Sequence, residues 1–213
     1  MAALLAVDPN PAHDRDEPTG HQRSLRDLID GLSMEMTPGF SHDTRVTECL
    51  LQGTHAFIPW LPGASSDEIV VAAAKLREQG MRPVPHVAAR KMPNHAALDR
   101  FLRDLHAEVA VDQLLIIGGD VSEPEGKFDC ALEVLQSGGL PDRGIIRVGV
   151  GAYPEGHPHV SDSALLDALL QKQEYAIQSG LDMFVVTQFA FNAALMAAWL
   201  EVVRAAGLGC QST

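Results

Sequence analysis

Six short apolar runs, separated by segments with helical periodicity, constrain the fold of this 213-residue chain more than any other feature. Most of the runs are continuously hydrophobic, which is typical of parallel strands that are buried on both faces. The predicted strands cover residues 31–36, 55–60, 82–88, 113–118, 145–151 and 183–188. The predicted helices cover residues 42–51, 66–79, 94–108, 127–137, 162–179 and 192–206, and Ser65, Asn94 and Ser161 are predicted N-caps. This alternation predicts an α/β fold.

Strand–helix alternation is compatible with a doubly wound sheet or with a closed barrel. Polar residues follow nearly every strand here, which favours a (β/α)8 TIM barrel, because such barrels build their sites at the C-terminal ends of the strands. A complete barrel has eight strands in typically ~250 residues, and this sequence supplies about six of the eight β/α units. We therefore expect residues 23–213 to form a C-terminally incomplete TIM-barrel catalytic domain, after a flexible leader over residues 1–22 and a short helix from Ser24 to Ile29.

Charge and composition exclude several classes of protein. A net charge of −12 and a pI near 5.0 argue against binding of nucleic acid, which requires a basic surface. No apolar stretch reaches the ~20 residues of a membrane span, and the N-terminus lacks the basic region of a signal peptide. The three cysteines, Cys49, Cys130 and Cys210, show no ligand spacing, so neither a disulfide framework nor a metal site is predicted. We expect a soluble, cytoplasmic protein.

Glu35 and Asp120 are the candidate catalytic acids. Glu35 lies in an apolar strand between Met34 and Met36, an environment that raises the pKa of a carboxyl group and suits a general acid. The structural alternative is a carboxylate satisfied by a neighbouring Lys, Arg or main-chain group. Asp120 follows Gly118 and Gly119, which allow a ligand to approach the backbone closely; the alternative is an ordinary turn in which Asp caps the next segment.

The segment 152–158 holds the densest group of functional side chains. Tyr153, Glu155 and His157 lie in a loop stiffened by two prolines directly after a strand, as in the wall of a ligand site. His157 and His159 lack partners at metal-ligand spacing. His86 and Gln188, each taken alone, fit a structural role as well as a functional one. Their shared position at the ends of strands favours the functional role. The sequence contains no GxSxG, GxGxxG or GxxxxGK[ST] motif, which argues against a serine hydrolase, a Rossmann unit and a P-loop.

In this order, the segments resemble the methylenetetrahydrofolate reductase family over residues 31 to about 206. The segments that carry the resemblance are Ser33-Met34-Glu35-Met36-Thr37-Pro38, Pro85-His86, Gly119-Asp120, Ala152-Tyr153-Pro154-Glu155-Gly156-His157-Pro158 and Thr187-Gln188-Phe189. The last two are the most specific. The amino-acid sequences of residues 85–90 and 117–120 are similar to those of a short bacterial branch of the family.

The resemblance implies a TIM barrel that binds FAD non-covalently and passes a hydride from reduced flavin to 5,10-methylenetetrahydrofolate, giving 5-methyltetrahydrofolate for one-carbon metabolism and methionine biosynthesis. NAD(P)H is the electron donor that we expect, and the sequence does not distinguish NADH, NADPH and a protein partner in this role. Glu35 matches the general acid that helps to open the imidazolidine ring, and Asp120 matches an acid near both flavin and pterin. The implied cofactor-binding residues are His86, Gly119, Asp120, Ala152, Tyr153 and His157, and Gln188 is the implied folate contact.

The chain departs from the family at three places. Gly118 stands where the family often carries an Arg that could bind polar groups of the flavin. Residues 58–62 replace a Thr-Tyr-Gly pattern, and residues 174–176 replace basic residues expected to face the flavin phosphates, with Lys172 as a candidate substitute. A non-catalytic flavin- or folate-binding paralogue is the alternative. A barrel aldolase with Lys91 as its Schiff-base lysine is a third reading. The open edges of a six-stranded barrel predict either a homo-oligomer that covers the edge or a sequence that is part of a longer barrel.

Overall fold

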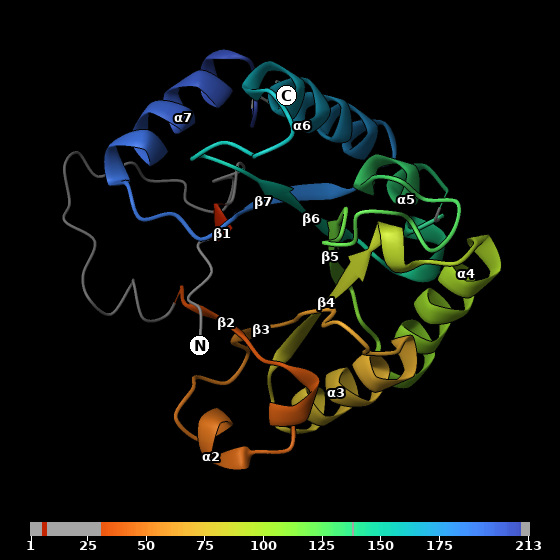
Figure 1. Cartoon of the computed structure of the whole chain (residues 1–213). Coiled ribbons are helices and arrows are strands. Elements are labelled where there is room, and N and C mark those ends of the chain that lie inside the picture. The colour runs from red at the N-terminus through yellow and green to blue at the C-terminus, as the bar shows by residue number, and fades with distance from the viewer. Residues whose placement is uncertain (1–5, 8–30, 138, 210–213) are drawn as a thin grey trace.

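A curled sheet of parallel strands forms the framework of the protein. The computed structural model describes residues 6–7, 31–137 and 139–209. The six parallel strands are β2 (Ser33–Glu35), β3 (His55–Ile58), β4 (Arg82–Ala88), β5 (Gln113–Ile117), β6 (Arg147–Ala152) and β7 (Asp182–Thr187). Their order in the sheet is their order in the chain, and helices lie between successive strands (Figure 1). This half-barrel confirms the predicted partial (β/α)8 fold.

A short strand, β1 (Ala6–Val7), pairs with β7 in the antiparallel direction and was not predicted from the sequence. Its register places Ala6 opposite Val186 and Val7 opposite Val185. These two residues are the only part of the predicted leader that the structure describes. The remainder of the leader and the predicted helix from Ser24 to Ile29 lie outside the described residues.

Four of the helices begin where a polar side chain caps them. The capping residues of α3 (Ser66–Glu78), α4 (His95–Asp104), α6 (Asp162–Gln178) and α7 (Ala193–Ala205) are Ser65, Asn94, Ser161 and Asn192. At α3 the arrangement is reciprocal, because the Ser65 side chain accepts from the main chain of Glu68 and the Glu68 side chain accepts from the main chain of Ser65. The three predicted N-caps are confirmed.

Two predicted helices were wrong in extent, and a third has a different last turn. Residues 42–51 contain only α2 (Thr44–Thr47), since the β-branched Thr47 turns its hydroxyl to Thr44 O (3.0 Å) and to the Gln79 side chain (2.7 Å). Residues 94–108 continue past α4 as a π-helical turn, Leu105–Val109, which ends at Ala110 with a φ of 52°. The helix predicted from residue 127 is α5 (Ala131–Ser137), because the Glu133 carboxylate accepts the main-chain N–H groups that precede it.

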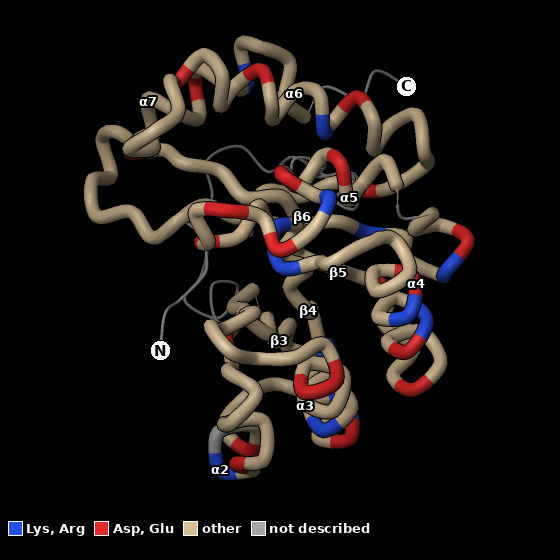
Figure 2. Tube along the Cα trace, turned by 45° about the vertical axis from the view of Figure 1, so that its right-hand side comes forward, with Lys and Arg blue, Asp and Glu red and all other residues tan. Residues whose placement is uncertain are grey.

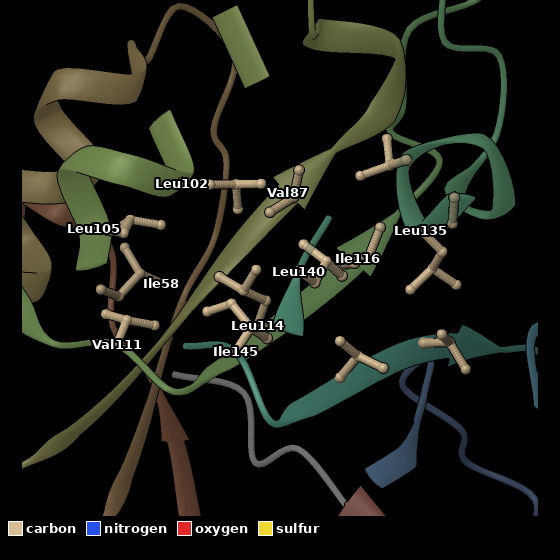
Figure 3. Close-up of a cluster of buried hydrophobic side chains, with 14 of the residues drawn as sticks. Ile58, Val87, Leu102, Leu105, Val111, Leu114, Ile116, Leu135, Leu140 and Ile145 are labelled. Carbon is tan, nitrogen blue, oxygen red and sulfur yellow. The ribbon is translucent and has the colours of Figure 1, made fainter. Parts of the chain in front are cut away.

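Two separate cores flank the sheet. The outer core fills the space between the sheet and the helices, and Figure 3 shows part of it, with Leu114, Ile116 and Ile145 among its members. The inner core lies within the curl and consists of Phe57, Val84, Leu115, Phe184 and Val186, with Ile117 packed against it. Gly149 makes room for this packing, since a Cβ there would lie 2.6 Å from the Phe184 ring.

The surface carries charges of both signs. Basic positions are interspersed with acidic ones along α3 and α4 (Figure 2). Among the described residues, no helix is both long and apolar enough to cross a membrane.

Candidate active site

The C-terminal ends of the parallel strands form one rim of the half-barrel, and the candidate residues lie on it. Glu35 is the last residue of β2, and His86 lies two residues before the end of β4. Asp120 follows β5 by three residues, and Gln188 directly follows β7. Parallel strands present these ends on the same edge, so the topology brings residues distant in sequence to a common rim.

Three of these side chains belong to the inner face of the curl. Glu35 pairs in register with Phe57 of the inner core. His86 and Gln188 each lie two residues after an inner-core valine, and side chains two residues apart along a strand share a face. The main-chain N–H of Gln188 donates to Ala152 O at 2.8 Å, which extends the pairing of β7 with β6 by one residue.

The Glu35 carboxyl group is half-buried between partly buried Met34 and buried Met36. Burial raises the pKa of Glu35 above its usual value, because an apolar environment disfavours the charged form. The main-chain N–H of Met36 donates to Phe57 O at 2.8 Å and fixes the end of β2. The direction of this pKa shift is the one that the sequence predicts, and it makes Glu35 a proton donor nearer to neutral pH.

His86 is buried on the inner face, with 6% of its surface exposed. Its ring lies edge-on to Phe57, with 6.2 Å between the ring centroids. Burial lowers the pKa of His86 to about 3, so the imidazole is neutral at physiological pH. Within the described part of the chain, His86 Nε2 has no hydrogen-bond partner. A buried polar atom of this kind is expected to bind a group that enters the site.

The backbone at Gly118 and Gly119 is open to the approach of a ligand. Gly119 has a φ of 100°, which favours glycine, and a Cβ there would lie 3.6 Å from the Ala88 Cβ. A Cβ on Gly118 would meet no atom within 4 Å. Asp120 follows on the exposed side of the same turn.

Tyr153 and His157 form an aromatic pair after β6. Their ring centroids lie 5.0 Å apart in an edge-to-face arrangement. The main-chain N–H of His159 donates to His157 Nδ1 at 3.2 Å, which orients the His157 ring. The Tyr153 hydroxyl lies 4.0 Å from the position of a Cβ built on Gly151, which places it over the inner face of β6.

Ala152 occupies a different position from the other candidates. Its side chain is buried in the outer core, between the sheet and the helices. Only its main-chain carbonyl, which accepts from Gln188, contributes to the rim. The Ala152 side chain is therefore not grouped with the inner-face residues.

Glu155 joins the loop after β6 to the loop after β7. Its Oε1 atom accepts from the main-chain N–H groups of Phe191 (2.9 Å) and Asn192 (2.7 Å), at the start of α7. This bridge holds the segment that carries Gln188 against the segment that carries Tyr153. The sequence offers no local signal for it, because its partners are 36 and 37 residues away.

We expect Glu155→Ala to lower the free energy of unfolding by about 1 kcal/mol, because two main-chain N–H groups lose charge-assisted hydrogen bonds at an exposed site. Glu155→Gln retains an acceptor oxygen and should lose less than half as much. Denaturant unfolding of both variants measures the difference. Unchanged stability of Glu155→Ala would contradict the bridging role.

A cavity of about 340 Å³ lies between α6, α7 and the end of β6. Tyr153 and Pro154 line it near the rim, Leu169 and Trp199 supply apolar walls, and Lys172 lines it from α6. Burial lowers the pKa of Lys172. No ion pair or hydrogen bond joins Lys172 to another residue in the described ranges. A partly buried ammonium group in such a cavity is suited to bind an anion.

A family model described as methylenetetrahydrofolate reductase matches residues 51–212, which is more than half of the chain. The match covers β3 to β7 and includes His86, Asp120, Tyr153 and Gln188. Glu35 lies before the matched segment.

Proposed function

The chain belongs to the methylenetetrahydrofolate reductase family, and we propose on that premise that it is a flavin-dependent reductase of 5,10-methylenetetrahydrofolate with NAD(P)H as the donor. The observation that carries the proposal is the half-buried Glu35 carboxyl group, whose pKa is raised. It stands on the inner face of the rim that also carries Gln188 and the loop of Tyr153. A proton donor on this rim is what the reaction requires.

The residues present fit a flavin. His86 offers a buried nitrogen without a partner, the Gly118–Gly119 backbone leaves open space, and the Tyr153–His157 pair supplies an aromatic wall. This combination of groups is suited to bind a planar ring with polar edges. Lys172 is the basic residue that we assign to the flavin phosphates. When bound, the flavin supplies the hydride, and the protein supplies orientation and charge.

The side chains on the rim account for the remaining chemistry. Protonated Glu35 donates to the folate nitrogen as a C–N bond of the imidazolidine ring breaks, which leaves an electrophilic iminium carbon. The Asp120 carboxylate stabilises the positive charge that develops on the substrate. The Gln188 amide has both donor and acceptor atoms, which match the alternating polar edge of a pterin.

Absorption spectroscopy of the purified protein with added FAD tests this function. A bound flavin band that NAD(P)H bleaches and methylenetetrahydrofolate restores would support the reductase. A band that NAD(P)H bleaches and the folate does not restore would favour the alternative, a non-catalytic flavin-binding paralogue. That alternative is favoured by Gly118, which lacks the arginine often found there in the family. The absence of flavin binding at any concentration would overturn the reductase assignment.

Lys172→Met tests whether Lys172 binds the phosphates of FAD. We expect the Kd for FAD to rise roughly tenfold, corresponding to the loss of about 1.4 kcal/mol from one charge-assisted contact. The Kd for riboflavin should not change, because riboflavin has no phosphate. Flavin fluorescence titration measures both values, and Lys75→Met, which removes an exposed lysine of α3, is the control. Equal weakening of FAD and riboflavin would show that Lys172 does not act on the phosphates.

A further inference from the structure

The segment from Gly118 to Cys130 joins β5 to α5 without forming a helix or strand, and it carries Asp120. Most of its residues are exposed, and only Phe128 is buried. An exposed connection of this length has little packing of its own to define its conformation. The position of Asp120 therefore depends on what holds this segment.

Arg90, two residues after β4, makes five bonds to the segment. Its main-chain N–H donates to Gly118 O at 2.9 Å, and its carbonyl accepts from the N–H of Glu125 at 2.7 Å. In the guanidinium group, Nη1 donates to Val121 O at 3.1 Å and Nε donates to Asp129 O at 2.9 Å. Nη2 lies 2.9 Å from the Asp129 carboxylate. One side chain thus joins the beginning of the segment to its end.

The other contacts hold the far half of the segment. Lys91 pairs with Glu125 at 3.5 Å, and the Phe128 ring packs against His95 with centroids 4.8 Å apart. Gly126 lies so close to the main chain that a Cβ there would be 2.2 Å from Pro93 O. None of these contacts reaches Asp120, whereas the carbonyl groups of Gly118 and Val121, both bound by Arg90, lie on either side of it.

We propose that Arg90 is a positioning residue, which fixes Asp120 on the rim by binding the main chain on both sides of it. The inference rests on the proposed role of Asp120. All three guanidinium nitrogen atoms are engaged by the segment, and the charge is paired with Asp129. Arg90 therefore does not supply the charge that an arginine at position 118 would offer to a ligand. The planar guanidinium group of Arg90 has donors that point in three fixed directions, and the ammonium group of a lysine cannot reproduce this arrangement.

The first test does not depend on activity. Trypsin cuts after lysine and arginine, and Lys127 is an exposed lysine of the segment. We expect Arg90→Ala to raise the rate of cleavage after Lys127 at least tenfold. Arg90→Lys should be cleaved almost as fast as Arg90→Ala. Mass spectrometry of the fragments measures these rates. Asp129→Asn, which removes the ion pair and leaves the main-chain bonds, should give an intermediate rate. Arg77→Ala is the matched control, because Arg77 donates to Val109 O and Ala110 O elsewhere. Unchanged cleavage in Arg90→Ala would overturn the proposal.

The second test asks whether Arg90 acts through Asp120. We expect Arg90→Ala to change kcat and the Kd for FAD by about as much as Asp120→Asn does. The double variant should be no slower than Asp120→Asn alone, because residues that act together are not additive. Additive losses would contradict the proposed coupling. A chain without reductase activity would refute the proposed function and leave the trypsin result to decide whether Arg90 holds the segment.

Discussion

Replacing Glu35 with Gln is expected to slow reoxidation of the reduced flavin by methylenetetrahydrofolate by about 10²–10⁴-fold, the usual contribution of a general acid. The isosteric amide keeps the size of the side chain and cannot donate the required proton. Binding of FAD and its reduction by NAD(P)H should stay within about twofold of the unmodified protein, because neither step uses this proton. The pKa of Glu35 is raised by burial, so the rate of the unmodified protein should fall as the pH rises through that pKa.

Stopped-flow absorbance of the two half-reactions separates these effects. Glu48→Gln is the control, since Glu48 is an exposed carboxylate close to α2. Loss of both half-reactions in Glu35→Gln would point to damaged flavin binding. Normal reoxidation by the folate would remove Glu35 from the mechanism.

The second large effect concerns stability and needs no ligand. His86 has a pKa of about 3 in the folded protein and about 6.5 when unfolded. Between these values the unfolded state binds more protons, so the stability conferred by the neutral buried ring falls as the pH falls. Between pH 7.5 and pH 5, protonation of His86 in the unfolded state should lower the free energy of unfolding by about 2 kcal/mol. His86→Leu should remove that loss.

Urea unfolding at several pH values, with the unmodified protein and His86→Leu compared, isolates the contribution, because the other titrating groups are common to both. His42→Asn serves as the control for loss of an exposed histidine. Parallel pH profiles for the unmodified protein and His86→Leu would show that the ring is charged, or solvated, in the folded state.

The sequence predicted the strands well because their signal is local. Apolar runs, most of them continuous, located all six parallel strands, and the caps at Ser65, Asn94 and Ser161 located three helix starts. The raised pKa of Glu35 also followed from its immediate neighbours. These features depend on residues within one turn or one strand.

Interactions between distant segments were not predictable in the same way. The shortening of the helix around Thr47 depends on Gln79, and the bridge at Glu155 depends on Phe191 and Asn192. Arg90 has no distinguishing local pattern, and its contacts become visible only when β4 and β5 are adjacent. Hydrophobic periodicity predicts helices and strands, but it does not predict which loops will contact each other.

The sheet order described above has a kinetic consequence. Each parallel pair joins strands that are neighbours in the chain; Met34 and Ala56, for example, are 22 residues apart (56 − 34). Ala6 and Val186 are 180 residues apart (186 − 6), and closing the longer loop costs roughly 2 kcal/mol more in chain entropy. During synthesis the sheet can therefore grow strand by strand from β2, while β1 waits for a partner that emerges after the other parallel strands. We expect the β1–β7 pair to be the last part of the sheet to form.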